Sequence, residues 1–231
     1  MDKAGLRLAV GFTYRFSPVA MTIKRLIGEG AIGEPRSLRL IYVWDFHGRY
    51  IRRDDPASGL QARRVGRMDE GGPLVDCGVH QIDLARWWLG QEVTDFCATG
   101  AWVEEHENPD HVYLHLQHER GAHTTVEISY TYGHTAKEPV ASFIYDIVGT
   151  DGIIRFDREL GRFELRNAHG TTALDYASEK AFEQMYVAFR DALVHGEQTD
   201  LPSGRDGMLA SHLAVAATEQ VRARLMSRSI P

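Results

Sequence analysis

The sequence predicts an α+β fold, with an open, mostly antiparallel sheet and helices gathered on one face. The main observation is a series of segments between residues 93 and 165 in which apolar and polar side chains alternate, separated by turn residues and by no helical pattern. Strands joined by short turns pair antiparallel. Segments with helical spacing come before and after this series, so the helices can cover one face of the sheet.

The N-terminal part begins with an apolar stretch at residues 6–12, which we expect to form a short buried strand ending in a turn. Ser17 is a suitable helix N-cap, and Pro18 fits the first helical position because its missing N–H costs nothing there. This helix is expected to stop at Gly30. Residues 36–46 then alternate in the manner of a long strand.

Residues 48–68 are polar, rich in arginine and without periodicity, which is typical of a surface loop. A glycine pair then opens a second helix, expected over residues 73–89 and closed by Gly90. Two further helices are expected over residues 178–195 and 203–226. Between the helix at residues 73–89 and the helix at residues 178–195, strands are expected at residues 93–103, 112–117, 124–132, 141–148, 153–156 and 163–165.

The composition of the 231 residues is ordinary for a globular protein, with 43% hydrophobic and 25% charged residues. A net charge of -6 gives no reason to expect a nucleic-acid partner. No apolar run approaches the roughly 20 residues that a membrane span needs, and no secretory signal is visible. Cys77 and Cys97 form no CxxC pair, so we expect two buried or inert thiols in a cytoplasmic protein.

A Gly-x-Gly-x-x-Gly pattern occurs at Gly28, Gly30 and Gly33. A dinucleotide-binding loop follows a strand and opens a helix, because the pyrophosphate lies on the helix N-terminus. These glycines are expected to end a helix and lead into a strand, where the helix dipole repels phosphate. The sequence therefore predicts no cofactor-binding residues in this chain.

Asp76 and His80 are four residues apart, so on a helix they share one face, and Asp83 follows three residues later. A carboxylate beside an imidazole suits acid–base chemistry near neutral pH, because the acid fixes the tautomer of the histidine. An Asp/His pair that merely braces the helix is the alternative, and spacing alone favours it. The entry through Gly71 and Gly72 favours a ligand site, because it leaves the helix start with little side-chain cover.

The segment containing these residues resembles the signature helix of the glucose-fructose oxidoreductase and inositol dehydrogenase family. Its Gly-Gly-x-x-x-Asp-x-x-x-His-x-x-Asp pattern, at residues 71–83, precedes the ending Trp-x-x-Gly. Three other segments match the family in the same order: VGFTYRF at residues 10–16, IGEGAIGEP at residues 27–35 and LPSGRDG at residues 201–207. The resemblance covers essentially the whole chain.

The resemblance implies a two-domain enzyme that uses NAD or NADP to oxidise or reduce a sugar, cyclitol or related alcohol. His80 would be the catalytic acid or base, and Asp76 would position the substrate and the histidine. Arg15, Asp83 and Trp44 are expected to contact the substrate, and the open sheet is expected to support a homo-oligomer. No nucleic-acid or membrane partner is implied.

The family's nucleotide-binding domain and its Glu-Lys-Pro lysine have no counterpart here. We therefore interpret residues 1–12 as the remnant of the last strand of a nucleotide-binding domain and residues 13–231 as a C-terminal substrate-binding and oligomerisation domain. The isolated chain is expected to bind NAD or NADP weakly or not at all and to be inactive alone. The alternative is a non-catalytic oligomerisation or ligand-binding module derived from that family.

Two other features remain open. His111, His115, His118 and His123 cluster around one predicted hairpin, but no cysteine or carboxylate completes an obvious ligand set, so solvated histidines are favoured and no metal is predicted. The arginines of residues 49–67 either form an anion-recognising lip over the substrate pocket or belong to a hydrated surface loop.

Overall fold

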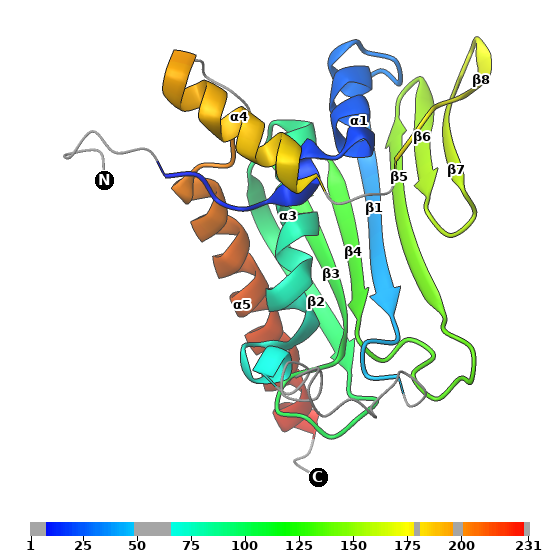
Figure 1. Cartoon of the computed structure of the whole chain (residues 1–231). Coiled ribbons are helices and arrows are strands. Elements are labelled where there is room, and N and C mark those ends of the chain that lie inside the picture. Colours follow the sequence, from blue (N-terminus) through cyan, green and yellow to red (C-terminus); the bar gives the residue numbers. More distant parts are fainter. Residues whose placement is uncertain (1–7, 49–65, 178–180, 196–200, 229–231) are drawn as a thin grey trace.

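The computed structural model describes residues 8–48, 66–177, 181–195 and 201–228. They form one sheet of eight strands in the order β2-β3-β4-β1-β5-β6-β7-β8 (Figure 1). The strands are β1 (Pro35–Trp44), β2 (Val93–Ala101), β3 (His111–His118), β4 (His123–Ser129), β5 (Ala141–Gly149), β6 (Gly152–Asp157), β7 (Arg162–Asn167) and β8 (Gly170–Ala173). The helices are α1 (Pro18–Gly28), α3 (Val79–Leu89), α4 (Phe182–His195) and α5 (Gly204–Arg228).

The sheet is antiparallel except at its centre. There β1 pairs parallel with β4 and antiparallel with β5, so that Leu38 lies between Thr124 and Ile147. Two antiparallel meanders, β2-β3-β4 and β5-β6-β7-β8, are thus joined through β1. The α+β prediction with a mostly antiparallel sheet is confirmed.

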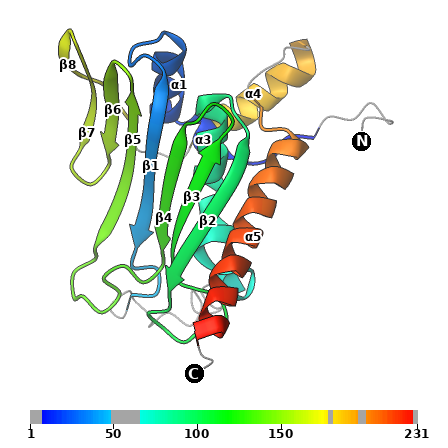
Figure 2. The same cartoon turned by 180° about the vertical axis from the view of Figure 1, so that it is seen from behind.

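The helices lie on one face of the sheet, as predicted, and among the described residues no helix covers the opposite face (Figures 1 and 2). Helix α3 packs against β1 and β4, and α5 packs against β2. The apolar side chains between these layers form the core, with Trp88, Ile23 and Leu114 almost completely buried. The indole N–H of Trp88 donates to the carbonyl of Ala20 at 3.0 Å, which ties α3 to α1.

Local signals explain where several elements begin and end. The Ser17 hydroxyl accepts a hydrogen bond from the Ala20 N–H at 3.1 Å, which caps α1 as predicted. Gly90 ends α3 in the left-handed conformation, with φ 58°, as expected for a glycine after a helix. Gly28 is the last residue of α1, and Gly30 and Gly33 lie between α1 and β1, which confirms the predicted order of helix and strand.

The structure differs from the sequence prediction in four elements. Residues 8–12 form no strand; only Ala9 makes a β-bridge, to Ser203. The second helix begins with a π-helical turn, Leu74–Gly78, before α3. Strand β8 was not predicted, because its short polar sequence lacks apolar alternation. Residues 66–69, predicted as the end of a loop, are helical, while residues 49–65 lie outside the described residues.

The two cysteines differ in exposure. Cys77 is partly buried, whereas Cys97 is exposed, so of the two expected alternatives, a buried or an inert thiol, burial does not hold for Cys97. Both are free thiols. No helix in the described part of the chain is long and apolar enough to cross a membrane.

Candidate functional site

Asp76 lies in the π-helical turn that precedes α3. Gly71 and Gly72 lead into this turn with φ values of 123° and 75°, which side-chain-bearing residues rarely adopt. A π-helical turn inside a helix is a feature frequently found at functional sites. The side chain of Asp76 is 15% exposed.

Three donors hold the Asp76 carboxylate. Arg67 contacts Oδ1 at 2.6 Å, and the Tyr130 hydroxyl and the Cys77 thiol both donate to Oδ2. Burial, and then the proximity of Cys77 and Asp76, raises the pKa of Tyr130 far above its ordinary value, so this hydroxyl remains a donor. Burial, and then the charge of Asp76, also raises the pKa of Cys77, to about 12. The carboxylate is therefore fixed in place.

His80 lies in the first turn of α3 and is half-buried. Two aromatic rings meet its imidazole edge-on: Tyr14, with a centroid distance of 4.8 Å, and Phe12, at 5.5 Å. These contacts fix the plane of the imidazole. The structure thus places Asp76 and His80 on consecutive turns of one helix, as the sequence predicted.

Aromatic side chains from the ends of β1 and β4 line the region beside Asp76. Trp44 stacks on Tyr42 at 4.2 Å and meets Tyr130 edge-on at 5.0 Å. The hydroxyls of Tyr42 and Tyr14 hydrogen-bond each other, and burial raises the pKa of both. Arg158 lies 4.8 Å from the ring centre of Phe143, on the same aromatic group. Trp44, which is predicted to contact the substrate, therefore packs on Tyr130, whose hydroxyl donates to Asp76.

Arg15 and Asp83 face each other rather than the Asp76 carboxylate. Arg15 Nε and one terminal nitrogen donate to the two Asp83 oxygens at 2.7 and 2.5 Å, and the side chains are 6% and 1% exposed. Burial raises the pKa of Asp83 although the Arg15 charge opposes this shift. Asp206 of α5 lies 3.5 Å from the same guanidinium. The pair connects α3 to the 3₁₀ turn Thr13–Phe16 and α5, and its contact with substrate stays a prediction.

The four clustered histidines divide between the two faces of the sheet. His111 and His115 share the open face, as predicted, and His115 stacks on His123 at 5.4 Å. His118 points into the core, where it hydrogen-bonds Thr124 at 2.9 Å. Burial lowers the pKa of His118 to about 4. These histidines therefore do not converge on one point.

Sequence reasoning missed Tyr130, Arg67, Tyr14 and Tyr42. Tyr130 and Tyr42 belong to alternating strand segments, and nothing in a strand pattern indicates which helix a side chain meets. Arg67 was seen only as one of several arginines in a predicted loop. The contact of Tyr130 with Asp76 depends on how β4 lies against the turn Leu74–Gly78, which the sequence does not indicate.

Comparison with known proteins agrees with this architecture. Residues 20–155 match the GFO/IDH/MocA C-terminal domain. The chain is 30% identical over 161 residues to scyllo-inositol 2-dehydrogenase (NAD(+)) of Bacillus subtilis, covering 67% of this chain and 41% of that protein. It is 30% identical to D-apiose dehydrogenase of Rhizobium rhizogenes over 176 residues, covering 75% of this chain and 47% of that protein.

Solved structures share the fold. An oxidoreductase from Agrobacterium radiobacter in complex with NAD+, L-tartaric acid and magnesium superposes with a TM-score of 0.72 at 25% identity, over 95% of this chain and 64% of that chain. Aldose-aldose oxidoreductase from Caulobacter crescentus superposes with a TM-score of 0.73 at 19% identity, over 96% and 66%. The chain spans less than two thirds of the length of the two dehydrogenases named above. By its sequence match and its fold, this chain belongs to the GFO/IDH/MocA oxidoreductase family.

Proposed function

We propose that this chain is the substrate-binding part of an NAD(P)-dependent oxidoreductase that acts on a sugar, cyclitol or related alcohol. The observation that carries the proposal is the fixed Asp76 carboxylate, held by Arg67 and Tyr130 one turn before His80. A carboxylate that served only to brace its own helix would need no donors from two other segments of the chain. The family relatives named as inositol and apiose dehydrogenases support this substrate class.

In this proposal His80 exchanges the proton of the reacting hydroxyl, because an imidazole gives and takes protons near neutral pH. Asp76 accepts a hydrogen bond from a neighbouring substrate hydroxyl and so orients it toward His80. The stacked rings of Tyr42 and Trp44 offer an apolar surface for the C–H face of a polyol. Arg15 and Asp83, tied to each other, support the position of α3.

The glycine-rich segment of this chain does not suit the phosphates of a dinucleotide. The only Gly-x-Gly-x-x-Gly pattern in the sequence lies between α1 and β1, at the negative end of the helix dipole. We therefore assign no cofactor contact to this chain. The nucleotide-binding part would come from a separate domain.

A non-catalytic module of the same family is the second candidate. The observation that favours it is the face of the sheet that the described helices leave open, which would suit contact with a second copy (Figure 2). In that case Asp76 and His80 would persist without substrate. The two candidates differ in whether a polyol reaches His80.

An NMR titration distinguishes the substrate-binding part from the non-catalytic module. In it, the histidine-labelled chain is titrated with myo-inositol and with aldoses. We expect the His80 resonances to move with a dissociation constant of about 1 mM or tighter, and Asp76→Asn to weaken binding about tenfold. His169→Ala, which alters an exposed turn, should leave the binding unchanged. No movement of His80 with any polyol would contradict the substrate proposal.

A titration with NADH tests the cofactor part separately. We expect no binding to the chain alone, and micromolar affinity would overturn the assignment of the cofactor site to another domain. The coding sequence upstream of Met1 provides a further check. An in-frame glycine-rich strand–turn–helix there would support a two-domain enzyme, whereas a stop codon would support the stand-alone module.

A further inference from the structure

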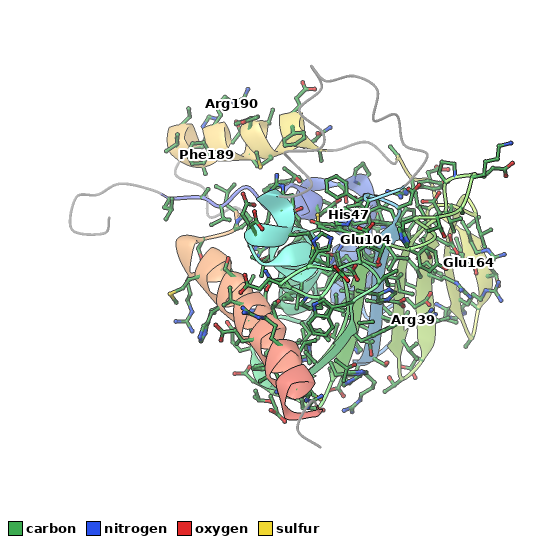
Figure 3. The ribbon with its side chains drawn as sticks, turned by 90° about the horizontal axis from the view of Figure 1, so that it is seen from below. Arg39, His47, Glu104, Glu164, Phe189 and Arg190 are labelled. Atoms are coloured by element: carbon green, nitrogen blue, oxygen red, sulfur yellow. The ribbon has the colours of Figure 1, made fainter. Side chains whose placement is uncertain are left out.

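His47, Glu104 and His106 come together at one end of the sheet. One ligand atom from each of these side chains lies within 4.8 Å of the other two. His47 follows β1, whereas Glu104 and His106 belong to the connection between β2 and β3. Figure 3 shows His47 and Glu104 next to each other in the view from below.

The topology of the sheet explains this meeting. Strand β1 runs parallel to β4, and two antiparallel pairings make β2 parallel to β4 as well. The C-terminal ends of β1, β2 and β4 therefore lie at the same end of the sheet. His47, the loop after β2 and His134 after β4 all emerge there. Sequence patterns miss this cluster because its members are far apart in the chain.

The backbone around the cluster is anchored. Asp110 is completely buried, and its carboxylate accepts hydrogen bonds from the backbone N–H groups of Val103 and Glu104 at 2.9 and 2.8 Å. The backbone N–H of His47 donates to the carbonyl of Tyr130 at 3.0 Å. The side chains that converge here thus project from a preformed frame, which is a requirement for an ion site that binds without reorganisation.

The side-chain atoms are close to the spacing of a metal site. His47 Nδ1 lies 2.7 Å and His106 Nε2 lies 3.5 Å from the same Glu104 oxygen, Oε2. Ligands of a tetrahedral zinc ion at about 2.0–2.1 Å are separated by about 3.3 Å. The two distances from Glu104 Oε2 therefore differ from this spacing by roughly 0.6 Å or less. His106 Nε2 is buried, and its distance of 3.5 Å from Glu104 Oε2 is longer than that of a well-formed hydrogen bond.

Two imidazoles and one carboxylate form a ligand set of catalytic zinc sites, in which a fourth position stays open. The Glu104 carboxylate gives the group a negative charge when both histidines are neutral. A cavity of about 580 Å³, lined by residues 102–107, opens beside the carboxylate and gives an ion access. His134 Nε2 lies 3.9 Å from the other Glu104 oxygen and can approach as a fourth ligand.

We propose that His47, Glu104 and His106 bind a divalent transition-metal ion of the zinc type. The site lies apart from His80 but next to the predicted substrate region, because the ring of His47 is 5.6 Å from that of Tyr130, which binds Asp76. It requires neither NAD(P) nor the proposed alcohol substrate.

Metal-free chain titrated calorimetrically with ZnCl₂, and with Co²⁺ observed through its ligand-field absorption, tests the proposal. We expect one ion per chain and a tetrahedral Co²⁺ spectrum. Glu104→Gln, His106→Ala and His47→Ala should each weaken Zn²⁺ binding at least about tenfold. Glu104 and His106 are partly exposed, so their variants should fold even if the one at His47 does not, and circular dichroism would verify this.

Two control variants locate the ion. His115→Ala removes half of the stacked His115–His123 pair on the open face, and His169→Ala removes an exposed histidine; both should bind Zn²⁺ as the unaltered chain does. Absence of stoichiometric binding would overturn the proposal and leave His47 and Glu104 as a hydrogen-bonded pair. Loss of binding in His115→Ala with retention in Glu104→Gln would overturn it as well.

Discussion

Replacement of Asp83 by alanine removes a carboxylate that binds the Arg15 guanidinium in the interior of the protein. Both side chains are almost completely buried, and two of their nitrogen–oxygen distances are 2.7 and 2.5 Å. Breaking such a pair from one side costs about 3–5 kcal/mol, because the remaining charge stays buried. Asp206, 3.5 Å from Arg15, still compensates part of the Arg15 charge in this variant. We therefore expect a loss near the lower limit, about 3 kcal/mol.

Equilibrium urea unfolding of Asp83→Ala measures this loss, with the slope of the transition as a check that unfolding stays two-state. Glu29→Ala is the matched control, since its pair with Arg25 has a similar distance, 2.7 Å, but both side chains are more than half exposed. That variant should lose only about 0.3–0.5 kcal/mol. The double variant Arg15→Met/Asp83→Leu should recover most of the stability, because it removes both charges of the buried pair together and leaves neither one uncompensated by the other.

Equal losses in Asp83→Ala and Glu29→Ala would refute this reasoning. Such a result would mean that the Arg15–Asp83 pair is hydrated in solution and available to a ligand. It would therefore favour the predicted role of both residues in substrate binding over their role as a tie between α3 and the turn before α1.

Three further predictions concern other parts of the molecule. Burial lowers the pKa of His118 from its ordinary 6.5 to about 4, so the unfolded chain binds a proton that the folded chain does not, and stability falls as pH is lowered. Between about pH 7 and about pH 5, unfolding measurements should show a loss of about 2 kcal/mol that is absent in His118→Gln. Cys77, with its pKa raised to about 12, should react with iodoacetamide much more slowly than exposed Cys97, and equal rates in peptide mapping would contradict this. Gly149→Ala should cost about 1–3 kcal/mol in thermal unfolding, because the added Cβ would lie 2.1 Å from the Ile32 carbonyl oxygen. An unchanged Tm would contradict this and would mean that the backbone at Ile32 moves away at no cost.

Features that depend on neighbours in the chain were predictable from sequence. Ser17 caps α1 through a residue three positions away, and Gly90 ends α3 through its own backbone conformation. The alternation in β3, where Leu114 is buried and Tyr113 exposed, follows from the two-residue period of a strand. The placement of Asp76 and His80 on consecutive turns of one helix was predictable from their four-residue spacing.

Features that depend on tertiary contacts were not predictable. The apolar run at residues 6–12 resembles a strand, yet Phe12 packs on His80 and Val10 packs against the core without entering the sheet. The parallel pairing of β1 with β4 leaves no trace in periodicity, and together with the antiparallel pairings of β2, β3 and β4 it brings His47 to Glu104. The hydrogen bond from Tyr130 to Asp76 was not predictable either, because it depends on the packing of β4 against the turn Leu74–Gly78.

The central position of β1 has a consequence for how the chain folds. The meanders β2-β3-β4 and β5-β6-β7-β8 can each form from sequence-local pairings, but Leu38 must meet Thr124 and Ile147, both far along the chain. Closing such long loops is slow, so β1 docks late. Until then β4 and β5 each present an unpaired edge, and intermolecular strand pairing competes with folding at that step. The yield of refolding should therefore fall with protein concentration, and a synthetic peptide of residues 35–44 should compete for the vacant position.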